Sequence, residues 1–104
     1  MTLRIRVTPE AEADINEAYV WYEQARPGLG GRFTAALRET LHEVARNPTA
    51  SRAVHEGIRR ALVQQFPYAV FYVHDERNID VVACLHARRD PSTWRIRGRS
   101  QLEQ

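Results

Sequence analysis

The chain opens with a short alternation of apolar and polar side chains. Leu3, Ile5 and Val7 alternate with arginines and a threonine, and this period of two with β-branched residues predicts a strand with one buried face. Thr8-Pro9 follows. Because threonine can cap a helix and proline fits its first turn, a helix is expected to begin here.

Two apolar stripes at helical spacing come next. The first stripe falls on Ala11, Ile15, Ala18, Tyr19 and Tyr22, and the second on Leu29, Phe33, Leu37, Leu41 and Val44. Each stripe predicts a helix with one buried face. Arg26-Pro27-Gly28 separates them and Asn47-Pro48 ends the second. A connection this short predicts an antiparallel helical hairpin.

After residue 55 the pattern changes to that of strands. Three runs of β character cover Gly57–Val63, Tyr68–Val73 and residues 79–86. The middle run is almost wholly apolar, as expected of a central strand covered on both faces. The turns between the runs are short, so the strands should form an antiparallel meander.

These elements predict an α+β fold with the order β-α-α-β-β-β. The helical hairpin would pack on one face of a small, mainly antiparallel sheet, giving two layers. The sequence has neither internal repeats nor a linker, so residues 1–104 are treated as a single domain. The tail from Asp90 is polar and rich in arginine, and its Trp94 should pack against the body of the domain.

Composition excludes several classes of protein. No apolar run approaches the roughly 20 residues that span a bilayer. Residues 1–6 lack the apolar stretch of a secretory signal, so a cytoplasmic protein is expected. The single cysteine excludes an internal disulfide framework, and the four histidines are far apart in the sequence. We therefore expect neither a metal site nor a cofactor.

Charge is placed unevenly along the chain. All fifteen basic residues are arginines, and five of them lie within residues 88–99 against one aspartate. Arginine and tryptophan are frequent anchors of protein interfaces, and arginines also hold phosphates. The tail could instead be a solvated end, but a large exposed indole argues against that. The region therefore resembles an interaction surface.

Three other places carry candidate chemistry. His86, close to Arg88, could act as a general acid or base on a phosphodiester, although a strand-end histidine more often bonds a backbone group. Arg59 and Arg60 must point to opposite faces of their strand; each either packs its stem or contacts an anion. Trp21 lies off the buried stripe, so it either packs under a loop or marks a surface for a partner chain.

Taken together, the chain resembles the RelE/ParE superfamily of bacterial type II toxins, and within it the ParE-like, plasmid-stabilisation branch. The matching pieces are the opening Val7–Ile15, the hairpin region Tyr22–Phe33, the strand Gly57–Arg60, the segment Phe66–Tyr72 and the ending Leu85–Trp94. They cover most of the chain in the order that the family has, and the order of elements derived above agrees with the fold of that family.

The resemblance implies a toxin that blocks DNA gyrase without performing chemistry and so arrests growth. It also implies a ParD-like antitoxin that binds the toxin, the operator DNA being contacted only through that antitoxin. The expected target-binding residues are Arg88, Arg89, Trp94, Arg95 and Arg97. The expected antitoxin-binding residues are Trp21, Tyr22, Phe33 and Arg60.

Two alternatives stay open at this point. The RelE branch cleaves mRNA in the ribosome, and by position Arg59, Arg60, His86 and Arg88 would surround the phosphodiester. The chain has no lysine and no tyrosine after Tyr72, and its hairpin is long, as in ParE; these features favour an inhibitor over an enzyme. The other alternative is a degenerate member that acts only in the repressor complex of the antitoxin.

Overall fold

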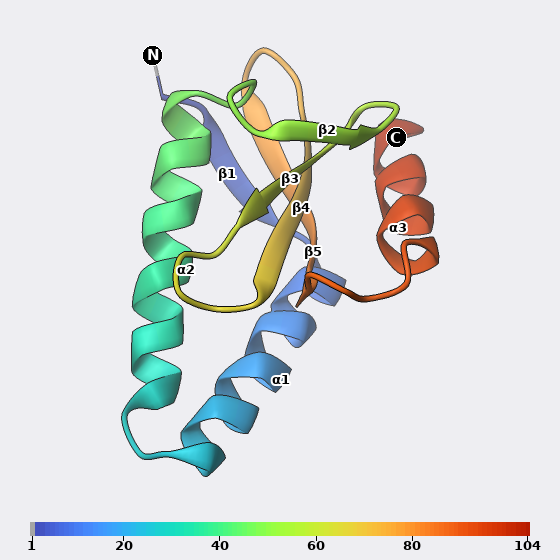
Figure 1. The fold of residues 1–104 in the computed structure, drawn as a ribbon. Coiled ribbons are helices and arrows are strands. Elements are labelled where there is room, and N and C mark those ends of the chain that lie inside the picture. Colours follow the sequence, from blue (N-terminus) through green and yellow to red (C-terminus); the bar gives the residue numbers. More distant parts are fainter. Residues whose placement is uncertain (1) are drawn as a thin grey trace.

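The computed structural model describes residues 2–104, so Met1 of the N-terminal segment that lacks a secretory signal pattern lies outside the described residues. It contains three helices and a five-stranded sheet (Figure 1). In chain order the elements are β1 (Arg4–Val7), α1 (Pro9–Ala25), α2 (Leu29–Arg46), β2 (Arg52–His55), β3 (Ile58–Leu62), β4 (Tyr68–His74), β5 (Asn78–His86) and α3 (Ser92–Leu102).

The sheet has the strand order β1-β5-β4-β3-β2. Strand β1 pairs parallel to β5, whereas every other pair of neighbours is antiparallel. The predicted hairpin, meander and mainly antiparallel sheet are therefore confirmed. The pairing of β1 with the last strand could not be read from local pattern, because 74 residues separate Arg4 from its partner Asn78.

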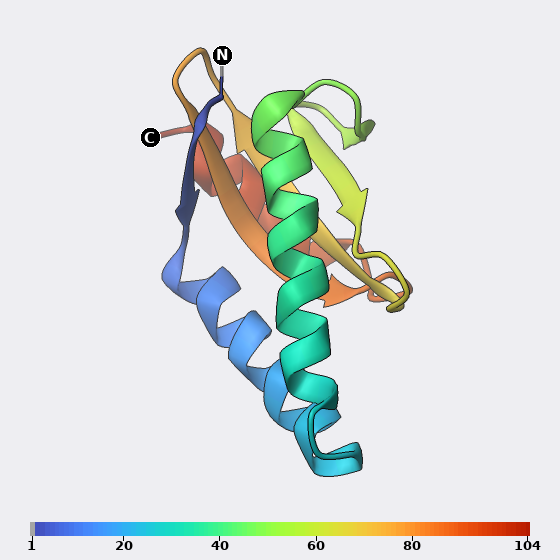
Figure 2. The same cartoon turned by 90° about the vertical axis from the view of Figure 1, so that its left-hand side faces the viewer.

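The central strand β4 is buried on both faces, as its apolar run predicts. Val70 and Tyr72 face α1 and α2, where they join the main core. Phe71 and Val73 point the other way, into a second and smaller core that includes Trp94 of α3. Figure 2 shows α2 in front of the sheet and α3 behind it.

Helix α3 is the largest departure from the prediction, since the tail was not expected to be helical. It carries no apolar stripe: only Trp94 and Gly98 are buried, and Ile96 is 65% exposed. Its start is fixed by Asp90, whose Oδ1 accepts a hydrogen bond from the Ser92 N–H at 2.8 Å. The expected two layers thus gain a third on the far face of the sheet.

Strand β2 was also missed, because it has no alternating pattern to detect. Its residues are exposed except Val54, and its pairing with β3 is interrupted by an irregularity between Ala53 and His55. Short length and a bulge are common ways of blunting the edge of a sheet.

The hairpin is closed by a carboxylate that the sequence analysis did not single out. The two oxygens of Glu23 accept hydrogen bonds from the N–H groups of Gly28 and Gly30, each at 3.0 Å. Gly28 precedes α2 with φ of 90° and supplies no side-chain cap of its own. Glu23 therefore satisfies the otherwise free N–H groups at the start of α2 and suits its positive end.

Close packing between α3 and β3 yields a first prediction. A methyl group on Gly98 would overlap the side chain of Ile58. Gly98→Ala should therefore lower the free energy of unfolding by about 1 kcal/mol, because the overpacking costs more than the better helix propensity of alanine gains. Gly31→Ala, which meets nothing within 4 Å, should instead be neutral or stabilising by up to about 1 kcal/mol.

Urea unfolding followed by circular dichroism measures both values. Adding Ile58→Val to the Gly98→Ala variant should recover part of the loss. Equal effects at the two glycines would contradict the packing described here.

Candidate functional site

Helix α3 is held to the body of the protein by an ion pair between Asp14 and Arg97. Arg97 Nη1 lies 2.6 Å from Asp14 Oδ2, and Nη2 lies 3.4 Å from Oδ1. The side chain of Asp14 is only 12% exposed and that of Arg97 only 25%. A two-pronged contact in such surroundings is stronger than an ion pair on the surface. Asp14 was not among the residues singled out from the sequence.

The same ion pair occupies the edge of β5 where β1 no longer covers it. Pairing of β1 ends at Val7 with Val81. Beyond that point the Cys84 N–H donates to Asp14 Oδ2 at 3.1 Å, and the Val82 carbonyl accepts from Arg97 Nη1 at 3.2 Å. Asp14 and Arg97 thus provide the hydrogen bonds that a neighbouring strand would have supplied.

Trp94 forms the apolar part of the same attachment. Its ring stacks on Phe71 with centroids 4.8 Å apart and planes at 10°, and only 6% of the residue is exposed. The guanidinium of Arg95 lies 5.4 Å from the Trp94 centroid, in the range of a cation–π contact. The expectation that Trp94 packs against the domain is confirmed.

The residues expected to bind the target therefore divide into two groups. Trp94 and Arg97 hold α3 on the sheet, so they are not offered freely to a partner. Arg88, Arg89 and Arg95 are exposed. These three arginines, which we call the α3 arginine surface, lie on the turn after β5 and on the first turn of α3.

Of the residues of the nuclease alternative, His86 and Arg88 adjoin each other at the end of β5, but Arg59 and Arg60 do not join them. His86 pairs with Tyr68, whereas Arg59 pairs with Tyr72, four residues further along β4, or about 13 Å. Arg60 is partnered with Phe71 and points to the opposite face.

His86 and Arg59 each have a contact within the fold. His86 Nδ1 accepts a hydrogen bond from the Arg88 N–H at 3.1 Å. Arg59 Nη1 donates to the carbonyls of Ser51 and Thr49, at 2.7 and 3.3 Å. The first contact orders the turn after β5, and the second fixes the loop before β2.

The residues expected to bind the antitoxin also separate by exposure. Tyr22 and Phe33 are 7% and 0% exposed; their rings stack at 5.3 Å and meet Phe66 and Tyr68 edge-on. Trp21 is 63% exposed and rests on Tyr22 with ring centroids 5.1 Å apart. The buried rings thus form a rigid base that holds Trp21 outward, with Val20 exposed beside it.

The structure offers neither a cluster of metal ligands nor a membrane-crossing helix within the residues it describes. Across residues 2–104 no three histidine, cysteine, aspartate or glutamate side chains gather as a metal site would require. Among the described helices, none combines the length and apolar character that a bilayer crossing demands.

Comparison with known proteins identifies the family of this chain. Residues 5–91 match the family model described as ParE toxin of type II toxin-antitoxin system, parDE. The chain belongs to the ParE toxin family. The matched span runs from β1 through the turn that carries Arg88 and Arg89, and thus ends just before α3.

Individual ParE proteins agree with this assignment. Toxin ParE2 of two Mycobacterium tuberculosis strains is 27% identical over 93 residues, covering 88% of this chain and 89% of the relative. A solved structure titled chromosomal ParDE TA system from P. aeruginosa superposes with a TM-score of 0.71 at 13% identity, covering 82% of this chain and 96% of that one. At that identity the superposition establishes a shared fold and nothing more.

The Asp14–Arg97 pair yields a second prediction. Asp14→Asn keeps an oxygen for the Cys84 N–H but leaves the Arg97 guanidinium without its counter-charge, so unfolding should become easier by about 2 kcal/mol. Arg99→Ala, an exposed change on the same helix, should cost less than about 0.5 kcal/mol. Chemical denaturation of both variants gives the comparison, and similar losses would show that the ion pair contributes nothing specific.

The buried thiol yields a third prediction. Burial, helped by the charge of Asp14, raises the pKa of Cys84 from 9.0 to about 12. The unfolded thiol therefore ionises first, and stability should fall as pH rises from about 9 towards 12. Cys84→Ala should show a shallower decline over that range, since it removes this contribution but leaves the tyrosines in place.

Thiol labelling checks the same burial independently. At pH 8.5 iodoacetamide should modify Cys84 in urea within minutes and leave the folded protein unmodified. Equal labelling rates in the two states would mean that the thiol is accessible.

Proposed function

We propose that this ParE toxin arrests growth by binding DNA gyrase, without a reaction of its own, and that a ParD-like antitoxin neutralises it. The observation that carries the proposal is the contrast between two sets of residues. Arg88, Arg89 and Arg95 are all exposed, whereas Arg59 and Arg60, which a nuclease would need beside His86 and Arg88, are separated from His86 by strand register or by face. Such a molecule is suited to docking rather than to bond cleavage.

The α3 arginine surface is our proposed contact with the target. Each guanidinium there presents planar donors that suit carboxylates. The Asp14–Arg97 pair and the Trp94–Phe71 stack fix the helix that carries Arg95. A rigid display of this kind loses little entropy on binding, which favours affinity. Because gyrase acts on chromosomal DNA, this mode of action also implies a cytoplasmic protein.

The outward part of the hairpin is our proposed contact with the antitoxin. Trp21 and Val20 are exposed next to each other on α1, and buried aromatic rings support Trp21 from below. An amphipathic segment of the antitoxin could cover this apolar surface by folding upon it. Operator DNA would then meet the toxin only through the antitoxin.

A supercoiling assay tests the proposed target and is our fourth prediction. Purified toxin should inhibit the supercoiling of relaxed plasmid by gyrase. Reversing the three charges of the α3 arginine surface, in Arg88→Glu/Arg89→Glu/Arg95→Glu, should weaken inhibition at least about tenfold, because rim and interface charges govern encounter and pairing. His86→Asn, which removes the imidazole but keeps a side-chain oxygen to accept the Arg88 N–H, should inhibit like the unaltered protein.

Arg4→Glu/Arg77→Glu serves as the control, since both arginines are exposed and lie away from α3, near the start of β1 and in the turn before β5. Cleavage of mRNA at codon positions in ribosomes, lost in His86→Asn, would overturn the proposal in favour of a nuclease. Absence of growth arrest on induction without the antitoxin would indicate a degenerate toxin.

A further inference from the structure

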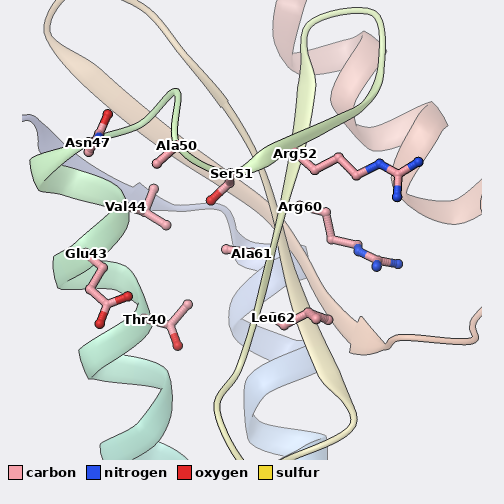
Figure 3. A pocket seen from close by; sticks show the side chains of 10 residues that line it. All are labelled: Thr40, Glu43, Val44, Asn47, Ala50, Ser51, Arg52, Arg60, Ala61 and Leu62. Atoms are coloured by element: carbon pink, nitrogen blue, oxygen red, sulfur yellow. The ribbon is translucent and has the colours of Figure 1, made fainter.

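A cavity of about 440 Å³ lies between α2 and the outer edge of β3 (Figure 3). It is distinct from the α3 arginine surface and from Trp21. Its lining comes from the C-terminal half of α2, from the loop between α2 and β2, from the start of β2 and from the end of β3. Because it follows the edge of a strand, its shape is that of a groove.

The edge of β3 is open along this groove. Pairing of β2 with β3 reaches Arg52 with Arg60 and goes no further. The Val63 N–H donates to the Tyr68 carbonyl, towards β4. Since backbone groups alternate sides along a strand, the N–H and C=O of Leu62 point away from β4, into the groove. This is where an added strand could form hydrogen bonds.

The two walls of the groove differ in chemistry. Figure 3 shows Arg52, Arg60 and Leu62 projecting to one side of β3 and Ala61 to the other, towards Val44 and Glu43 of α2. One wall is thus arginine with an exposed leucine. The opposite wall, on α2 and its C-terminal end, combines Val44 with the polar side chains of Thr40, Glu43 and Asn47.

Arg52 and Arg60 suggest that the groove binds an anion. They are directly opposite each other on neighbouring strands and point to the same side (Figure 3). Within residues 2–104 the only carboxylates within 4 Å of an arginine are those of Asp80 and Asp14, which pair with Arg6 and Arg97. Like charges in this arrangement repel each other. An anion between the two guanidinium groups would remove that repulsion.

The groove favours an acidic peptide over a nucleic acid as the source of that anion. A nucleic acid strand carries a phosphate at every nucleotide, and Glu43 on the facing wall would repel it. An extended peptide alternates its side chains between the two walls. Acidic residues can then meet Arg52 and Arg60 while the intervening apolar residues meet Val44 and Ala61.

We infer that this groove receives an extended segment of the antitoxin, in which acidic and apolar residues alternate, as a short additional strand on β3. The inference rests on the proposed function in one respect, namely that an antitoxin binds this toxin. It adds the place, the backbone geometry and the side-chain pattern of that contact. A carboxylate of the segment lies between Arg52 and Arg60, and the Leu62 backbone forms the hydrogen bonds.

The test, our fifth prediction, measures binding of the protein encoded by the reading frame beside this one, by isothermal titration calorimetry with the full-length toxin. Arg52→Glu/Arg60→Glu should weaken binding at least tenfold. Arg4→Glu/Arg77→Glu, with the same change in net charge, should bind like the unaltered toxin. Replacing acidic residues of the antitoxin segment with arginine should restore binding to the Arg52→Glu/Arg60→Glu variant.

The backbone contact is tested separately at one position. Leu62→Pro removes an N–H that β4 does not use, whereas Leu62→Ala keeps it; the first should weaken binding more than the second. Circular dichroism checks that both variants are folded. If Leu62→Pro does not fold, the result for Arg52→Glu/Arg60→Glu decides whether the antitoxin binds in the groove.

The outcomes separate the two proposals. Unaltered toxin that fails to bind would refute the proposed antitoxin partner. Binding that is tight in every variant would refute the groove alone. Loss of binding to a labelled single-stranded RNA in Arg52→Glu/Arg60→Glu, with antitoxin binding intact, would assign these arginines to a nucleic acid.

Discussion

One carboxylate, that of Asp14, links three elements of the fold, namely α1, β5 and α3. It accepts from the Cys84 N–H on β5 and binds Arg97 on α3 while lying on α1. Strand β1 is too short to cover all of β5, so without this carboxylate the end of β5 would have unsatisfied backbone groups at partly buried positions. Helix α3, with few apolar residues of its own, depends on the same contact for its orientation.

The arginines of this protein perform separate tasks although they are chemically identical. Arg97 and Arg6 are paired with carboxylates and stabilise the fold. Arg59 holds a loop through backbone carbonyls. Arg52 and Arg60 face a groove, and the arginines around α3 face solvent. A planar guanidinium that is always charged can serve each role, and only the surroundings decide which role it takes.

Local pattern sufficed for the elements whose burial has a simple period. The stripes of the hairpin and the apolar run of β4 correctly predicted two helices and a central strand. Helix α3 escaped because its attachment uses one indole, one glycine and one ion pair instead of a stripe. The ion pair joins residues 83 positions apart, a separation at which no periodicity operates. Tyr22 and Phe33 illustrate the converse: their stripe predicted burial, and burial keeps them from direct contact with a partner.

The parallel pairing of β1 with β5 also bears on how the chain is made. The first strand has no partner until residues 78–81 have been synthesised, and contacts of such long range form late because closing a long loop is entropically costly. The hairpin can assemble early from local contacts, whereas the sheet and α3 must wait. A nascent chain emerging from the ribosome therefore has neither the completed sheet nor α3 in place until nearly the whole polypeptide has been translated.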